Sequence, residues 1–216
     1  MRMRQEQIGE GFEKIVFSDP KRPEMVIAGI REDEVRPVPP ADIKARYYLQ
    51  KIIHMLFPKN IPDIHLAATK NGSRLRMQKM ELDSAHVRVQ KIRSRYLEAT
   101  EQEVNEWKQL DLEKQSDPRV RELSRKLTAA GVLVDKAGCN FAFNSAGEAQ
   151  YLDNDAPWFQ HLDGTYAYNY DENLLLRAIQ ELSEPEKGRT LGYFQRLHTL
   201  KKETGKSSAQ NNNPKE

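Results

Sequence analysis

Two aspartates and an asparagine in the second half of the chain have residue types and a spacing that could bind a metal ion and orient a hydroxyl group. Asn140 follows Asp135 across a short loop, and Asp153 comes at the end of the strand that returns from this loop. Amide and carboxylate oxygens are ligands that Mg²⁺ accepts, and a further carboxylate can orient a hydroxyl for attack on phosphorus. Because Asp and Asn also favour turns, the pattern leaves a purely structural role open.

A pair of glycines near the start of the chain is a second candidate feature. Gly9 and Gly11 flank Glu10 between two predicted strands. Glycine lets backbone N–H groups approach a phosphate with no Cβ in the way, so this hairpin could be a lid over phosphates. The pair does not open a helix, which excludes the dinucleotide-binding fingerprint of Rossmann folds. An ordinary turn is the alternative interpretation.

The elements that must position these residues begin with a sheet. In the first 80 residues, apolar stretches and turn residues predict three strands, a helix and two more strands. The predicted strands are a segment ending at Gly9 and residues 14–17, 25–31, 64–68 and 74–80, and the helix covers residues 41–56. Asn71 and Gly72 are typical of a hairpin turn between the last two strands. Successive hairpins imply an antiparallel sheet.

The rest of the chain is mainly helical in pattern. The predicted elements are charged helices within residues 84–130, a small hairpin over 141–143 and 149–152, and helices over 171–182 and 186–203. Asp117 and Pro118 are typical of the start of a helix over 119–130. Residues 205–216 are polar and offer no apolar face for a core. A sheet region followed by a helical region predicts the α+β class.

Composition and charge exclude several classes. The chain has 216 residues, with 34 Lys and Arg against 32 Asp and Glu, and this net charge of +2 argues against a nucleic-acid partner. Its one cysteine, Cys139, cannot form an internal disulfide, and neither it nor the five histidines have metal-ligand spacing. No apolar stretch has the length of a signal peptide or a bilayer span. We therefore expect a cytoplasmic protein without a membrane span.

The order of these features over residues 5–160 resembles that of the protein-kinase-like superfamily. The segment from Gly9 to Val16 resembles the family's glycine-rich loop, and Arg31 stands where the family has a lysine on its third strand. Asp135 and Asn140 match the Asp and Asn of the catalytic loop, and Asp153 matches the metal-binding aspartate. Four intervals agree in order, and each falls on the secondary structure that the family has there.

The resemblance implies a two-lobed α+β fold. The N-lobe would be residues 1–80, with an antiparallel sheet and one helix, and a reduced, mainly helical C-lobe would be residues 81–204. Residues 205–216 would be a disordered tail. The implied activity is transfer of the γ-phosphoryl group of ATP, with Mg²⁺, to an unidentified hydroxyl-bearing acceptor.

The resemblance also assigns roles to individual residues. Asp135 would be the catalytic base or orienting group, with Arg31 as the phosphate clamp. Asn140 and Asp153 would hold the metal ion. The nucleotide would be bound by Gly9, Gly11, Val16 and Arg31, by backbone groups of Gln78 and Met80 at the adenine edge, and by Ala142 beneath it.

Several positions depart from the family pattern. Arg31 replaces a lysine, and the helix over 41–56 offers Gln50 where the family has a glutamate, so the usual Lys–Glu ion pair cannot form. Leu133 and Val134 replace His-Arg, and Asn154 follows Asp153 in place of Phe. Because of these departures, the chain resembles small bacterial kinases that act on small molecules more closely than it resembles regulated protein kinases. They also leave open a non-catalytic kinase-like module that binds a nucleotide or a protein partner, and an unrelated α+β protein whose turns imitate the motifs.

Overall fold

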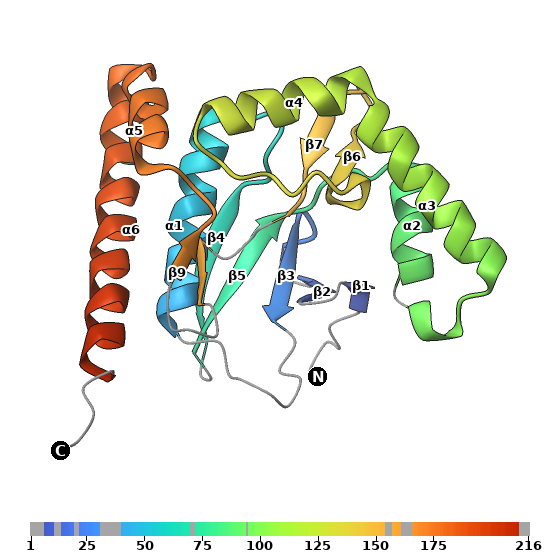
Figure 1. Ribbon diagram of the computed structural model, residues 1–216, viewed down its shortest axis with the longest axis horizontal. Helices are drawn as coiled ribbons and strands as arrows, with labels where there is room; N and C mark the ends of the chain where they lie inside the picture. The colour runs from blue at the N-terminus through green and yellow to red at the C-terminus, as the bar shows by residue number, and fades with distance from the viewer. Residues whose placement is uncertain are drawn as a thin grey trace.

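A five-stranded antiparallel sheet forms the first structural layer (Figure 1). The computed structural model describes residues 7–10, 14–19, 22–30, 40–69, 72–93, 95–153, 157–160 and 166–211. The strands are β1 (Gln7–Glu10), β2 (Lys14–Ser18), β3 (Met25–Ile30), β4 (Ile64–Thr69) and β5 (Gly72–Gln78), in the spatial order β1-β2-β3-β5-β4. The prediction of an antiparallel sheet built from these five segments is confirmed.

Helix α1 (Pro40–Leu56) connects β3 to β4 and packs against β4 and β5. Its buried apolar residues Ala45, Leu49, Ile52 and Ile53 recur every three or four positions and therefore share one face. This spacing is what predicted the helix, and the predicted range is confirmed to within one residue.

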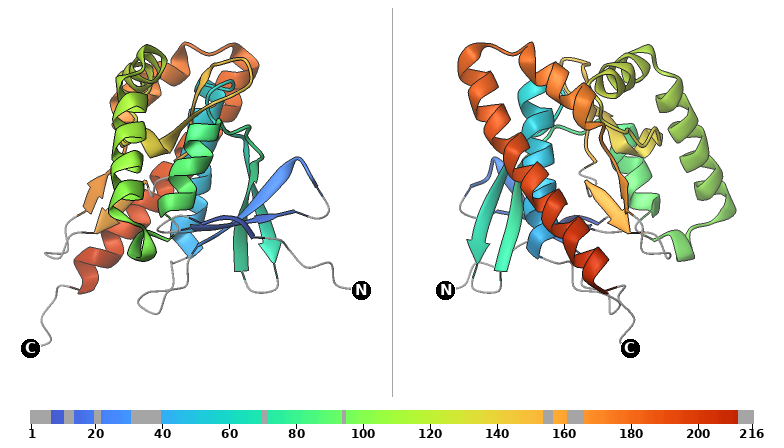
Figure 2. Two further views of the ribbon diagram at one scale, coloured as in Figure 1. Left: turned by 90° about the vertical axis from the view of Figure 1, so that its right-hand side faces the viewer. Right: turned by 60° about the vertical axis from the view of Figure 1, so that its left-hand side comes forward.

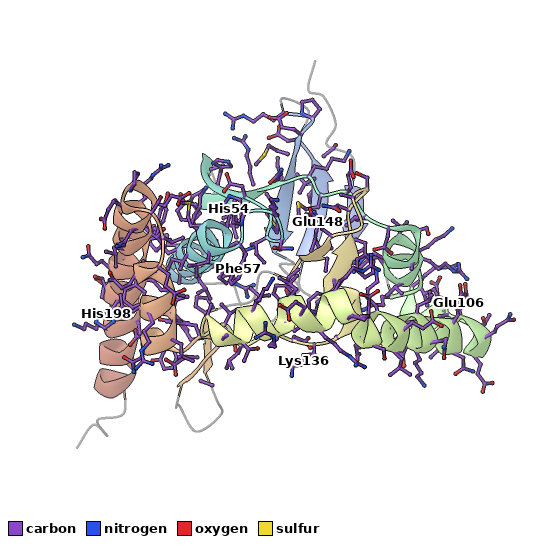
Figure 3. All side chains as sticks on the ribbon, turned by 90° about the horizontal axis from the view of Figure 1, so that it is seen from above. His54, Phe57, Glu106, Lys136, Glu148 and His198 are labelled. Carbon is purple, nitrogen blue, oxygen red and sulfur yellow. The ribbon has the colours of Figure 1, made fainter. Side chains whose placement is uncertain are left out.

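Four helical segments follow the sheet: α2 (Ser84–Arg93), the 3₁₀ helix η1 (Tyr96–Glu98), α3 (Glu101–Ser116) and α4 (Pro118–Ala129). Thr100 caps α3 by accepting the Glu103 N–H at 3.2 Å, and the Glu103 carboxylate accepts the Thr100 N–H at 3.0 Å. Asp117 ends α3 and caps α4, as the sequence predicts. Seen from above, α4 extends from the α5–α6 side of the molecule to α3 (Figure 3).

The chain leaves α4 through a glycine that no other residue can replace without strain. Gly131 has φ of 86°, and a Cβ there would lie 2.7 Å from the Asp171 carbonyl oxygen and 2.8 Å from Leu174 Cβ. The sharp exit brings the next residue, Val132, into a β-bridge with Tyr170. The start of the loop that contains Asp135 is thereby fixed against the segment that precedes α5.

Two small hairpins follow this loop. The 3₁₀ turn η2 (Gly138–Asn140) leads into β6 (Phe141–Phe143), which pairs with β7 (Ala149–Tyr151) as the sequence predicts. A second hairpin, β8 (Trp158–Gln160) with β9 (Tyr166–Tyr168), was not predicted.

The last two helices are α5 (Glu172–Gln180) and α6 (Glu184–Asn211), and α6 lies along α1 (Figure 2). The α6 backbone is helical as far as Asn211, which includes part of the predicted polar tail, and residues 212–216 lie outside the described residues. The central core joins these elements through fully buried side chains of Ile52, Ile61, Leu127, Phe141, Leu175 and Leu197. Within the described ranges, no helix has the length and apolar character needed to cross a bilayer.

Candidate functional site

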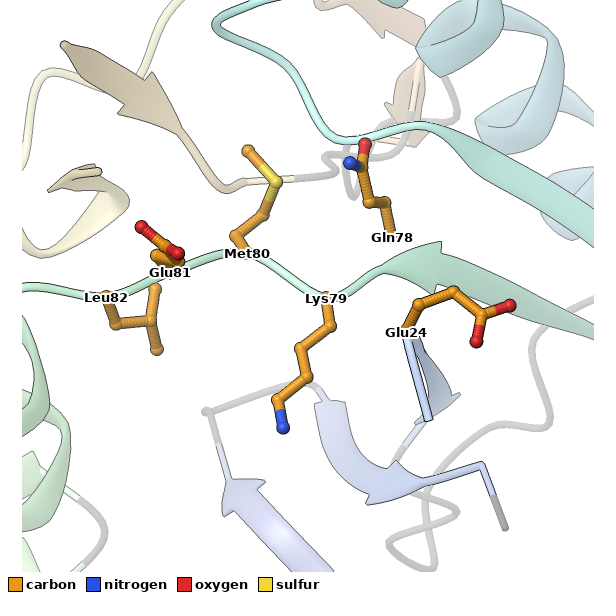
Figure 4. Close-up of a pocket in the computed structure, with 6 residues that line it drawn as sticks. All are labelled: Glu24, Gln78, Lys79, Met80, Glu81 and Leu82. Atoms are coloured by element: carbon orange, nitrogen blue, oxygen red, sulfur yellow. The ribbon is translucent and has the colours of Figure 1, made fainter. Parts of the chain in front are cut away.

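The linker between β5 and α2 borders an open hollow of about 600 Å³ (Figure 4). The hollow is lined by Glu24, Gln78, Lys79, Met80, Glu81 and Leu82. Figure 4 shows the Gln78 and Met80 side chains on the opposite side of the linker from the Lys79 side chain. The sequence analysis expected Gln78 and Met80 in a nucleotide pocket, and both line this hollow.

The main chain of the linker is partly free to bind a ligand. The Lys79 N–H donates to the Glu24 carbonyl at 2.8 Å, which ties the linker to the turn before β3. Among the described residues, the N–H groups of Met80 and Leu82 have no hydrogen-bond partner. Binding pockets commonly fix the orientation of a ligand with a few polar groups, which include main-chain N–H groups. The free N–H groups of the linker could therefore bind the polar edge of a planar ligand.

Asp83, at the end of the linker, fastens it to the β6–β7 hairpin. One carboxylate oxygen accepts the His86 N–H at 2.8 Å and so caps α2, and the other accepts the Phe143 N–H at 2.7 Å. A second connection joins the Glu81 carboxylate to the Ser145 N–H at 3.0 Å, in the hairpin turn. Two hydrogen bonds therefore join the linker to the hairpin.

Lys114 of α3 completes this connection from a buried position. Its Nζ lies 3.1 and 3.0 Å from the two Asp83 oxygens and donates to the Phe141 carbonyl at 3.2 Å. The Lys114 side chain is only 6% exposed. Burial alone would raise the pKa of Asp83, but its backbone hydrogen bonds and the Lys114 ion pair together lower that pKa below its usual range.

His86 lies in the same buried cluster. Its Nδ1 donates to the Phe141 carbonyl at 2.9 Å. Burial lowers the pKa of His86 below its ordinary value of 6.5, and the nearby Lys114 charge acts in the same direction. His86 is therefore neutral near pH 7. The sequence analysis assigned no role to Asp83, His86 or Lys114; only Asp83, placed directly before a helix, carried a local signal as a cap.

The loop from Asp135 to Asn140 is held by its own hydrogen bonds. One Asp135 carboxylate oxygen accepts the Ala137 N–H at 3.0 Å, and the Asn140 N–H donates to the Ala137 carbonyl at 3.0 Å. The Asn140 Nδ2 lies 3.4 Å from the Asp135 carbonyl oxygen. The Asp135 side chain is exposed, so it can meet a ligand from solvent.

Asn140 and Asp153 are brought together by the hairpin that separates them in sequence. The Leu152 N–H donates to the Asn140 carbonyl at 2.8 Å, directly beside the Phe141–Tyr151 pair of the ladder. This hydrogen bond brings the main chains of the two segments close together, while Asp153 and not Asn140 lines the pocket described next. The described residues contain no group of three His, Cys, Asp or Glu that could hold a metal by themselves.

Asp153 also faces a small cavity beneath α1. The cavity has a volume of about 20 Å³ and is lined by Leu49, Gln50, Ile53, Val132, Leu133, Tyr151, Asp153 and Asn169. Gln50 is 3% exposed, and in the part of the chain that the structure describes its Nε2 has no hydrogen-bond partner. Gln50 thus shares a cavity wall with Asp153, the residue that the sequence analysis proposed as a metal ligand.

The structure describes only some of the remaining residues that the sequence analysis assigned to the site. Arg31 and Gly11 lie outside the described residues, so the structure says nothing of a phosphate clamp or of the full glycine segment. Gly9 and Val16 are a cross-strand pair of β1 and β2. Ala142 is fully buried in β6 and is not among the residues that line the hollow.

The Cys139 thiol is buried in the turn before β6. Burial raises the pKa of its thiol to about 11, so the thiol stays protonated near neutral pH.

No family model matches the chain, and no curated protein matches it.

Proposed function

We propose that this protein is an ATP- and Mg²⁺-dependent phosphotransferase with a two-lobed kinase-like fold, which transfers the γ-phosphoryl group to a hydroxyl acceptor. The observation that carries the proposal is the attachment of two features to one hairpin: the linker with open N–H groups, through Asp83, and the oxygen ligands Asn140 and Asp153. The connected linker and hairpin would then set the distance between a nucleotide base and its phosphates. Phosphoryl transfer depends chiefly on such positioning.

The linker would bind the base of the nucleotide. The N–H groups of Met80 and Leu82 can donate to ring nitrogens, and the neighbouring carbonyls can accept from an exocyclic amine. The glycines of the β1–β2 hairpin would allow close approach of the backbone to the phosphates, and Arg31 would pair with them.

Asn140 and Asp153 would hold the Mg²⁺ ion, which neutralises charge on the phosphates when bound. Asp135 would orient the acceptor hydroxyl and take its proton as the hydroxyl oxygen forms its bond to the γ-phosphorus. The bond from that phosphorus to the bridging oxygen breaks, and ADP leaves with the electron pair. The exposed position of Asp135 supports this role, because the acceptor must arrive from solvent.

Thermal unfolding with ATP and Mg²⁺ tests the proposal without a known acceptor. A ligand at a concentration 100 times its Kd stabilises the native state by about 2.7 kcal/mol, and for a chain of this size each kcal/mol raises Tm by about 2–4 °C. We expect a rise of about 5–10 °C that requires Mg²⁺. Asp153→Ala should abolish the rise, whereas the control Glu113→Ala, on the exposed side of α3, should keep it. No rise in the wild type at millimolar ATP would refute nucleotide binding.

A non-catalytic binding module is the second candidate. The observation that favours it is the apolar tip of the α2–α3 arm, where Leu97 is 97% exposed and Tyr96 is 54% exposed. Large exposed apolar side chains of this kind often mark a contact with another protein. In that case Asp135→Asn would leave function intact and Leu97→Ser would weaken binding of the partner.

A further inference from the structure

The cavity beneath α1 combines a small volume with an unsatisfied polar group. The Gln50 side chain comes from α1, Val132 and Leu133 from the loop after α4, and Asp153 and Asn169 from the segments after β7 and β9. Four parts of the chain that are separated in sequence therefore meet around about 20 Å³ of space.

Gln50 cannot satisfy its amide elsewhere. Its neighbours on α1, Leu49 and Ile53, are each only 4% exposed, so this stretch of the helix is held in the core and the side chain cannot turn to solvent. Its Nε2 has no acceptor among the described residues. A buried donor without an acceptor destabilises the folded state. The pocket that Gln50 lines is the open space next to its side chain where an acceptor could lie.

We propose that this cavity holds one ordered water molecule that accepts from Gln50 Nε2 and donates to the Asp153 carboxylate. A water molecule needs about 10–15 Å³ of cavity measured in this way, so a volume of about 20 Å³ is enough for one molecule. A buried water also needs two to four polar partners. Gln50, Asp153 and Asn169 supply three, and a carboxylate accepts several hydrogen bonds at once.

The water makes Gln50 a positioning residue for Asp153. It ties the carboxylate to α1, so the orientation of a candidate metal ligand depends on a helix that never touches the metal. Groups that hold a metal ligand in place commonly change metal affinity by about 10–100-fold when they are removed. This second step rests on the proposed function, whereas the water itself does not.

The change Gln50→Leu tests the water through the sign of its effect on Tm. If the cavity holds the water, the substitution removes a partner of that water and Tm falls by about 3–6 °C. If the cavity is dry, the substitution removes an unsatisfied buried amide and Tm rises. Gln150→Leu is the matched control: Gln150 is 6% exposed, its Oε1 has no partner among the described residues, and it does not line this cavity. We expect this control to leave Tm unchanged or higher.

A crystal structure of the wild-type protein decides the matter directly, even if Gln50→Leu fails to fold. We expect density for one water within hydrogen-bond distance of Gln50 and Asp153. An empty cavity, or a bound metal cation in place of water, would overturn the proposal.

Titration of Mg²⁺ at fixed ATP tests the positioning step. We expect Gln50→Leu to raise the Mg²⁺ concentration for half of the ATP-induced Tm shift about 10-fold, and Gln150→Leu to leave it unchanged. An unchanged midpoint in Gln50→Leu would refute the positioning role. If the wild type shows no Mg²⁺-dependent shift, the proposed function fails, while the crystal structure and the sign of the Tm change still decide whether the water is present.

Discussion

Lys114→Met is expected to destabilise the fold more than any exposed charge change, because it leaves the Asp83 carboxylate without its cation. Methionine keeps the length and the apolar stem of the lysine side chain and removes only the ammonium group. The Phe141 carbonyl keeps His86 as a donor, so the substitution leaves Asp83 as the principal group without compensation.

The size of the effect follows from burial. Removing one partner of a buried ion pair costs about 3–5 kcal/mol. The Asp83 side chain is 21% exposed and keeps the N–H groups of His86 and Phe143, which places the expected loss near the lower limit, at about 3 kcal/mol. Since a domain is commonly stable by about 5–15 kcal/mol, the variant should still fold.

Urea unfolding followed by tryptophan fluorescence and by circular dichroism measures this loss. With a slope of about 2 kcal/mol per M, the midpoint should fall by about 1.5 M. The matched control is Lys126→Met on α4, where the lysine is 55% exposed and lies 3.5 Å from Glu122. Exposed pairs of this kind contribute about 0–1 kcal/mol, so the control midpoint should move little.

A double-mutant cycle with Asp83→Asn separates the ion pair from general damage. If the two groups interact as the structure shows, the double variant should lose about 2 kcal/mol less than the sum of the single losses. Equal midpoints for Lys114→Met and Lys126→Met, or additive losses in the cycle, would refute the assignment of a buried ion pair.

Two further outcomes are expected. The folded-state pKa of His86 is lowered, so the unfolded chain binds this proton more readily; the contribution of His86 to stability is complete above about pH 6.5 and is lost as the pH falls below it. Unfolding free energies measured between pH 5 and 8 should show this slope in the wild type, and a His86→Gln variant that keeps the same slope would contradict it. Gly131→Ala should cost well over 1 kcal/mol, because its Cβ would meet the Asp171 carbonyl at a positive φ. The control Gly188→Ala, in α6 with no atom within 4 Å of the new Cβ, should stabilise by about 1 kcal/mol, and similar Tm changes in the two variants would argue against strain at Gly131.

Much of the fold could be predicted from local patterns. The apolar spacing of α1, the turn residues before β5 and the cap at Asp117 each depend on neighbours within a few positions, so the sequence alone indicates these elements. The β8–β9 hairpin was not predicted; in the structure its strands place the rings of Trp158 and Tyr168 in contact, which is a cross-strand relation that no local pattern indicates. α6 extends to Asn211, beyond the predicted end of the helix at residue 203.

In the candidate site, too, some features could be predicted from the sequence and others could not. The types and spacing of Asp135, Asn140 and Asp153 are properties of the sequence, and the sequence by itself determined that Asn140 and Asp153 would flank one hairpin. The buried contact of Lys114 with Asp83, and the cavity that Gln50 shares with Asp153, were decided only by the tertiary structure. Lysine and glutamine are usually exposed residues, so nothing local marks these two as buried. Their burial follows from the packing of α3 against η2 and of α1 against the loop after α4, which joins residues separated by tens of positions.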